Sequence, residues 1–147
     1  MSAHSEVVIL VADDDEGHVR LIEKNLRRAA LVNRIERFED GQEVLDYLFC
    51  RSSRHREKGT PYLLLLDIRM PKVDGLEVLR QLKHDMELRK IPVIMLTTTD
   101  DPQEVERCYL LGCSNYIVKP VDYERYAAAV NKLGNFITLL QVPDLKS

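Results

Sequence analysis

The chain has 147 residues, which is an ordinary length for one domain, and its formal net charge at pH 7 is −3. Hydrophobic residues make up 45% of the chain and charged residues 31%, a balance that excludes an intrinsically disordered protein. No uncharged stretch approaches the roughly 20 apolar residues of a membrane span, and acids follow the first apolar run too early for a secretion signal. We therefore expect one cytoplasmic domain over residues 1–147, without membrane association and without nucleic acid as its main partner.

Short runs of β-branched and aliphatic residues alternate along the chain with longer segments of helical periodicity. In chain order, strands are predicted over Val7–Ala12, Arg34–Phe38, Tyr62–Leu66, Pro92–Thr97 and Asn115–Val118. Helices are predicted over Glu16–Ala30, Gly41–Cys50, Gly75–Met86, Gln103–Leu111 and Tyr123 to about Leu140. This alternation predicts an α/β fold, with a parallel sheet covered by helices on both faces.

Two segments have features that this alternation does not explain. Residues 51–60 (RSSRHREKGT) are polar and basic, and they indicate a solvated surface loop, with a partner-binding role as the alternative. The last helix carries an apolar stripe that we interpret as its inward face: Tyr126, Val130, Leu133, Ile137 and Leu140. We expect the part from Tyr126 to Leu133 to pack on the sheet. Phe136, Leu139 and Val142 broaden the apolar surface beyond that stripe, which predicts a homodimer through this helix and its extension.

The cysteines and histidines form no pattern typical of a disulfide framework or a zinc site. The three cysteines are odd in number and lie in apolar segments, which predicts reduced thiols packed against apolar neighbours: Cys50, Cys108 and Cys113. The four histidines are scattered, and we interpret them as surface residues: His4, His18, His55 and His84.

Acidic residues follow two of the predicted strands. Asp13, Asp14 and Asp15 come after the first strand, and Asp67 comes after the third. Ligands of doubly wound sheets bind beyond the carboxyl ends of the strands, where these side chains would gather. Gathered carboxylates repel one another unless a cation neutralises them, and Mg²⁺ prefers carboxylate oxygens. The sequence therefore predicts a magnesium site at this edge, with Asp15 turned to solvent.

A hydroxyl group and an ammonium group are expected at the same edge. Thr97 ends the fourth predicted strand, and Lys119 follows the fifth. A hydroxyl can donate to an anionic oxygen, and a lysine beside metal-bound carboxylates can bind a transferred phosphoryl group. The chain has no GxxxxGK[ST], GxGxxG or GxSxG motif. The pattern favours phosphoryl transfer without a nucleotide, with an aspartate as the nucleophile.

Four motifs now stand in order: VADDD, LLLLDIRMPKVDG, LTTTDD and NYIVKP. Together they resemble the receiver domain of bacterial two-component response regulators, over roughly Val7 to Lys132. The resemblance implies a flavodoxin-like doubly wound (βα)5 three-layer sandwich, with a five-stranded parallel sheet in the order 2-1-3-4-5. It also implies a signalling domain, not an enzyme, that accepts a phosphoryl group from a sensor histidine kinase in a Mg²⁺-dependent reaction.

The resemblance assigns roles to individual residues. Asp67 would be the phosphoacceptor. Mg²⁺ would be held by Asp13, Asp14, Asp67 and the backbone carbonyl of Arg69. Thr97 and Lys119 would bind phosphate oxygens, and Tyr116 would be an aromatic switch, with simple packing at a strand end as its alternative. The Lys119–Pro120 bond would be cis. Arg69 and Thr99 would influence how fast phosphate is lost.

The insertion at residues 51–60 and the tail LGNFITLLQVPD narrow the resemblance to small stand-alone regulators that serve phytochrome kinases. In that interpretation residues 7–132 form the core, and residues 133–147 form a helical extension too short for a DNA-binding module. A generic phosphorelay or chemotaxis receiver is the alternative. A Mg²⁺-dependent aspartyl-phosphate phosphatase would need a second acid where Arg69 stands, and a flavodoxin-like cofactor binder would need a phosphate-cradling loop instead of VADDD.

Overall fold

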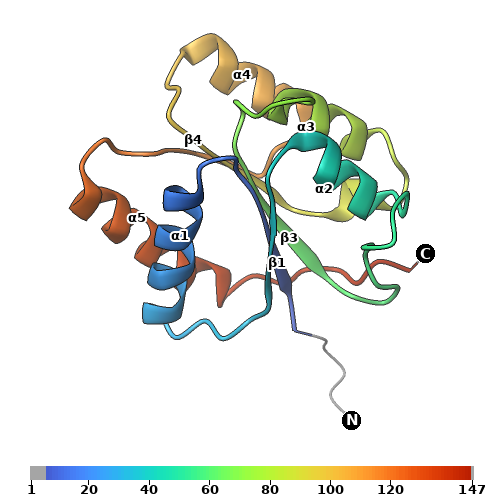
Figure 1. Cartoon of the computed structure of the whole chain (residues 1–147), viewed down its shortest axis with the longest axis horizontal. Helices are drawn as coiled ribbons and strands as arrows, with labels where there is room; N and C mark the ends of the chain where they lie inside the picture. Colours follow the sequence, from blue (N-terminus) through green and yellow to red (C-terminus); the bar gives the residue numbers. More distant parts are fainter. Residues whose placement is uncertain (1–5, 147) are drawn as a thin grey trace.

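Five parallel strands form one sheet in the order β2-β1-β3-β4-β5 (Figure 1). The computed structural model describes residues 6–146. Residues 1–5 and residue 147, at the two ends of the predicted domain, lie outside the described residues. The strands are β1 (Val8–Ala12), β2 (Ile35–Phe38), β3 (Tyr62–Leu66), β4 (Val93–Thr97) and β5 (Asn115–Val118). The helices are α1 (Glu16–Arg28), α2 (Gly41–Leu48), α3 (Gly75–Lys83), the 3-10 helix η1 (Leu88–Lys90), α4 (Pro102–Leu111) and α5 (Tyr123–Ile137). The predicted α/β fold and its strand order are confirmed.

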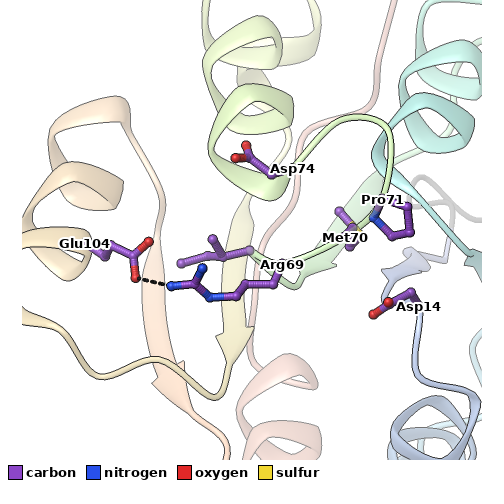
Figure 2. Close-up of a pocket in the computed structure, with 7 residues that line it drawn as sticks. Asp14, Arg69, Met70, Pro71, Asp74 and Glu104 are labelled. Atoms are coloured by element: carbon purple, nitrogen blue, oxygen red, sulfur yellow. Dashed lines mark hydrogen bonds and ion pairs between the residues drawn. The ribbon is translucent and has the colours of Figure 1, made fainter.

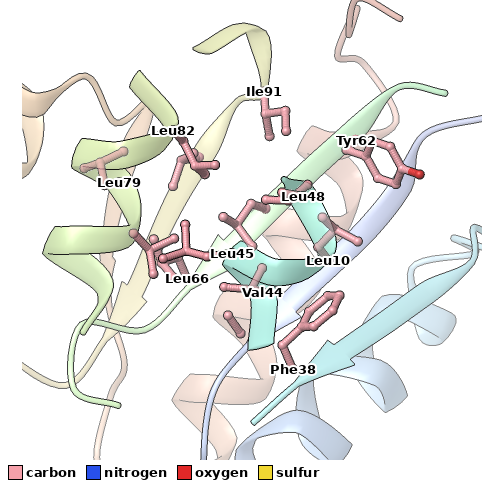
Figure 3. Packing of buried hydrophobic residues seen from close by; sticks show 14 of the residues in the cluster. Leu10, Phe38, Val44, Leu45, Leu48, Tyr62, Leu66, Leu79, Leu82 and Ile91 are labelled. Carbon is pink, nitrogen blue, oxygen red and sulfur yellow. The ribbon is translucent and has the colours of Figure 1, made fainter. Parts of the chain in front are cut away.

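The central strands β1 and β3 are apolar throughout because helices cover both faces of the sheet. All five residues of each strand are buried, and the register pairs Ala12 with Leu66. Figure 3 shows one core layer, in which Leu45 of α2 and Leu82 of α3 lie over the sheet. On the opposite face α1 and α5 pack together. This register places the residues that follow β1 and β3 side by side.

Each α-helix begins at an aspartate whose side chain accepts a hydrogen bond from a backbone N–H of the first turn. The capping residues are Asp15, Asp40, Asp74, Asp101 and Asp122. Asp15 is therefore a helix cap at the exposed start of α1, and it accepts from the N–H of His18 at 3.1 Å. Of the three aspartates that follow β1, this leaves Asp13 and Asp14 for a metal ion.

The predicted helix ends were too late by two to three residues in four helices. Backbone φ angles of 65° at Ala30 and 57° at Cys50 turn the chain out of helical geometry after α1 and α2. This turn also exposes Cys50, so its predicted packing was wrong, whereas Cys108 and Cys113 are buried thiols as expected. The 3-10 helix η1 is too short for periodicity to predict it.

The α5 helix buries the predicted stripe against α1 and the sheet. Tyr126, Val130, Leu133 and Ile137 are buried, and Leu140 packs partly against the same cluster. Gly134 allows the close approach, because a Cβ atom at this position would lie 2.7 Å from the Cβ of Ala29. The sequence stripe is therefore the inner face of this helix.

The predicted helical extension over residues 133–147 was wrong beyond Ile137, where α5 ends. The tail instead runs past the sheet toward the loop before β3 (Figure 1). Its Leu145 is 0% exposed within the core cluster beside α2 and α3, and its carbonyl accepts from the N–H of Gly59 at 2.7 Å. Pro143 cannot donate a helical hydrogen bond, and burial of Leu145 favours the extended path.

The polar segment 51–60 lies on the surface, as predicted, but it is held against β2 and α2. The Arg54 guanidinium lies 4.3 Å from the centroid of the Phe38 ring and 2.8 Å from a carboxylate oxygen of Glu36. A second Arg54 nitrogen lies 3.3 Å from Glu43. These contacts cover the edge strand β2, which otherwise could pair with another chain. None of the helices in residues 6–146 is both long and apolar enough to cross a membrane.

We expect Leu145→Ala to lower the free energy of unfolding by about 2–3 kcal/mol, because it removes a fully buried side chain and leaves a cavity. The matched control is Gln141→Ala in the same tail, where the side chain is exposed and the change should be within about 0.5 kcal/mol. Urea unfolding followed by circular dichroism measures both. Equal stability of the two variants would contradict the anchoring of the tail by Leu145.

Candidate functional site

Three carboxylates meet at the carboxyl ends of β1 and β3. Asp13 and Asp14 follow β1, and Asp67 follows β3, where its N–H donates to the carbonyl of Ala12 at 3.0 Å. One carboxylate oxygen from each aspartate lies within 4.8 Å of the others. Asp13 is buried, Asp67 is partly buried and Asp14 is exposed, so the cluster opens to solvent on one side. The structure thus brings together the three predicted acids.

Lys119, at the end of β5, supplies the positive charge of the cluster. Its Nζ lies 2.5 Å from Oδ2 of Asp13 and 3.5 Å from Oδ2 of Asp67, and its side chain is 2% exposed. Burial raises the pKa of the Asp13 carboxyl above its ordinary value, and the attraction of Lys119 only partly offsets this. Three ionised carboxylates and one ammonium leave two negative charges uncompensated. This balance fits a divalent cation.

His18 belongs to the site, although its sequence pattern indicated a surface residue. Its Nδ1 lies 3.1 Å from Nζ of Lys119 and 3.9 Å from Oδ2 of Asp13, and its ring contacts Tyr126 edge to face. The only signal in the sequence was its position in the first turn of the helix that begins beside the acids. The predicted surface positions of His55 and His84 are confirmed, and His4 lies outside the described residues.

Thr97 has a buried hydroxyl with no hydrogen-bond partner among the described residues. It ends β4, and its carbonyl accepts from the N–H of Lys119 at 2.7 Å, which ties the ends of β4 and β5 together. A buried hydroxyl without a partner costs about 1–3 kcal/mol. A bound anion beside Lys119 would satisfy it, which fits a site that receives a phosphoryl oxygen.

The carboxylate of Glu104 and the polar side chains that it contacts lie at the outer edge of the site (Figure 2). Glu104 of α4 accepts from the hydroxyl of Thr99 at 2.8 Å and lies 3.4 Å from a guanidinium nitrogen of Arg69. The hydroxyl of Tyr116, whose pKa burial raises to about 12, donates to the carbonyl of Thr99 at 2.7 Å. An open pocket of about 430 Å³ adjoins these groups and is lined by Asp14, Ile68, Arg69, Met70, Pro71, Asp74 and Glu104.

The predicted cis bond at Lys119–Pro120 was wrong, because the described residues contain no cis peptide bond. The trans form is favoured even before proline, by about 0.5–1 kcal/mol. In the trans chain the Lys119 side chain already reaches Asp13, so the geometry of the site does not require the cis form.

Gly75 supports the backbone at Asp67 and was not singled out in the sequence. It begins α3, and its N–H donates to the carbonyl of Ile68 at 2.7 Å. A Cβ atom here would lie 2.2 Å from the backbone oxygen of Asp67. Only glycine allows α3 to approach the backbone of Asp67 this closely.

Comparisons with known proteins identify the family of this chain. Residues 9–131 match the family described as response regulator receiver domain. Response regulator Rcp1 of Synechocystis is 31% identical over 112 residues, which cover 76% of this chain and 76% of Rcp1. The structure of the Mn²⁺-bound form of Rcp1 covers 92% of this chain and 98% of its own, with a TM-score of 0.85 and 27% identity.

Two further solved structures share the fold. A response regulator receiver domain from Rhodospirillum rubrum has a TM-score of 0.89 and 45% identity, and the match covers 95% of this chain and 99% of that one. The phosphorylated cyanobacterial phytochrome response regulator RcpA has a TM-score of 0.86 and 28% identity, with 92% and 97% of the two chains covered. The chain therefore belongs to the response regulator receiver-domain family, whose members signal through a phosphorylatable aspartate and a magnesium site.

Proposed function

We propose that Asp67 accepts a phosphoryl group from a sensor histidine kinase and that the change in charge alters contacts with a partner protein. The convergence of Asp13, Asp14 and Asp67 with Lys119 carries this proposal. An oxygen of Asp67 attacks the phosphorus of a phosphohistidine, the N–P bond breaks, and the imidazole keeps the electron pair. The domain is then a phosphoacceptor and not an enzyme acting on a separate substrate. Arg69 takes the position of the acid that a phosphatase of this chemistry would need.

The donor set fits a hard divalent cation. The three clustered side chains offer carboxylate oxygens, which Mg²⁺ prefers. Asp13, Asp14, Asp67 and the backbone carbonyl of Arg69 would hold the ion, which when bound supplies positive charge that lets an anionic donor approach. The Mn²⁺-bound form of the relative Rcp1 supports a divalent metal at this site.

The switch would use two groups that the phosphoryl group can engage. Lys119 would pass from Asp13 to a phosphoryl oxygen, because the phosphoryl group carries more negative charge than one carboxylate. Thr97 would donate its hydroxyl, which has no partner among residues 6–146, to another oxygen. Movement of the β4–α4 segment would then reach Tyr116 through its hydrogen bond to Thr99. We propose that Arg69 and Thr99 set the lifetime of the phosphoryl group.

A phytochrome-type kinase is the proposed donor. Support comes from the similarity to RcpA, which is described as a phytochrome response regulator, over 92% of this chain. We propose that the domain meets this kinase in the cytoplasm, and we expect neither nucleic acid nor a membrane as its partner. A generic phosphorelay receiver is the alternative, because the site geometry is the same in both.

We expect acetyl phosphate and Mg²⁺ to add one phosphoryl group to the wild type and none to Asp67→Asn. The asparagine amide is a much weaker nucleophile than the aspartate carboxylate, so it does not attack phosphorus. Intact mass measurement detects the adduct, and Asp15→Asn serves as a matched control because Asp15 caps α1 outside the metal cluster.

The same reaction in excess EDTA should give no adduct, since two uncompensated negative charges at the site repel the donor. Undiminished phosphorylation in EDTA would contradict the metal site. An adduct on Asp67→Asn would contradict the acceptor assignment.

We propose a homodimer through the end of α5. Phe136 is 44% exposed and Leu139 is 78% exposed, and they form an apolar surface at the end of the domain. Val142 is only partly exposed because the tail returns toward the sheet, so it contributes less than its sequence position indicated.

Sedimentation equilibrium should show a dimer for wild type and a monomer for Phe136→Asp/Leu139→Asp, because a charge at each position opposes burial of the pair. Arg107→Asp, on the exposed surface of α4 and outside the proposed interface, controls for the added negative charge. A wild type that stays monomeric at high micromolar concentration, with and without phosphorylation, would reject the dimer.

A further inference from the structure

The carboxylate of Glu104 joins two loops at the mouth of the site, and the phosphoryl-transfer scheme above gives it no task. One oxygen, Oε2, accepts from the Thr99 hydroxyl at 2.8 Å and lies 3.4 Å from the Arg69 guanidinium. Arg69 follows β3, and Thr99 follows β4. Figure 2 shows the Arg69 side chain extended toward Glu104 and away from Asp14. A single carboxylate thus fixes the position of the guanidinium beside the phosphoacceptor loop.

Helix capping does not explain this orientation of Glu104. A glutamate three residues after the capping residue commonly accepts from the backbone N–H of that residue. Here the Asp101 N–H contacts the Thr99 hydroxyl at 3.5 Å, and the Asp101 side chain accepts from the N–H of Gln103. The start of α4 is already capped, so Glu104 is free to bind Thr99 and Arg69.

The Arg69 guanidinium would have two anionic partners once Asp67 is phosphorylated. It lies two residues after Asp67, its side chain is 71% exposed, and its contact with Glu104 is a single long one. Guanidinium groups bind phosphate oxygens through two parallel hydrogen bonds, a stronger arrangement than one long contact. Glu104 and the phosphoryl group therefore compete for the same side chain.

We propose that Glu104 is a positioning residue that holds Arg69 off the phosphoryl group and so shortens the lifetime of the aspartyl phosphate. This inference rests on the proposed role of Asp67. In the loss reaction a water oxygen attacks phosphorus opposite the Asp67 oxygen, the P–O bond to Asp67 breaks, and its electron pair returns to the carboxylate. The water protons pass to solvent and to the released inorganic phosphate. An Arg69 guanidinium on the phosphoryl oxygens obstructs this approach, and Glu104 draws it away.

The test compares Glu104→Gln with Glu106→Gln. Glutamine keeps an acceptor for Thr99 and removes only the charge that holds Arg69, and Glu106 is an exposed glutamate of the same helix. Proteins phosphorylated with acetyl phosphate and Mg²⁺ are freed of the donor, and the remaining adduct is followed by intact mass. Because an exposed ion pair shifts an equilibrium only a few-fold, we expect the half-life of the adduct in Glu104→Gln to rise about threefold. Glu106→Gln should match wild type.

Two readouts separate positioning from a general structural effect. The difference between Glu104→Gln and wild type should shrink in roughly 1 M salt, where the screening length is about 3 Å. In an Arg69→Ala background, Glu104→Gln should have no effect, since no guanidinium remains to be released. An unchanged half-life in Glu104→Gln, or an equal effect in the Arg69→Ala background, would overturn the role of Glu104. A wild type that forms no adduct would overturn the acceptor assignment, and this role with it.

Discussion

The site depends on one buried ion pair, between Lys119 and Asp13. Three carboxylates converge where β1 and β3 end, and like charges this close destabilise one another. From the end of β5, the ammonium of Lys119 reaches Asp67 across β4, and it reaches Asp13 across β4 and β3. The whole edge of the sheet, from β1 to β5, is therefore organised around a charge that one lysine only partly neutralises.

This partial neutralisation links structure to signalling. A fully neutralised cluster would have no affinity for a cation, and a cluster without the lysine would be costly to keep buried. A cluster that Lys119 neutralises only in part can bind a divalent ion and, after it, a phosphoryl group. The two negative charges left over, the unpartnered hydroxyl of Thr97 and the exposed guanidinium of Arg69 are groups that such a ligand could bind.

The sequence predicted those parts of the fold that depend on patterns within a few consecutive residues, such as apolar periodicity and the polar residues that follow a strand. The buried strands, the acids after them and Lys119 follow from patterns of a few residues, and two strands, Tyr62–Leu66 and Asn115–Val118, are confirmed to the residue. Contacts between distant segments could not be predicted in this way. His18 meets Lys119 and Glu104 meets Arg69 only in the folded chain. Leu145 leaves the helical pattern and is buried in the core, where its N–H donates to the carbonyl of Thr60, 85 residues earlier in the chain.

The most direct test of this account is the thermal unfolding of Lys119→Met with and without Mg²⁺. Methionine keeps much of the apolar stem but leaves the buried Asp13 carboxylate without its partner, a loss of about 3–5 kcal/mol. Without metal, Lys119→Met should melt well below wild type, and Mg²⁺ should raise its melting temperature more than it raises that of wild type. Lys132→Met, on the exposed surface of α5, should behave as wild type. A Lys119→Met protein that melts like wild type and gains no more from Mg²⁺ would contradict the central role of the ion pair.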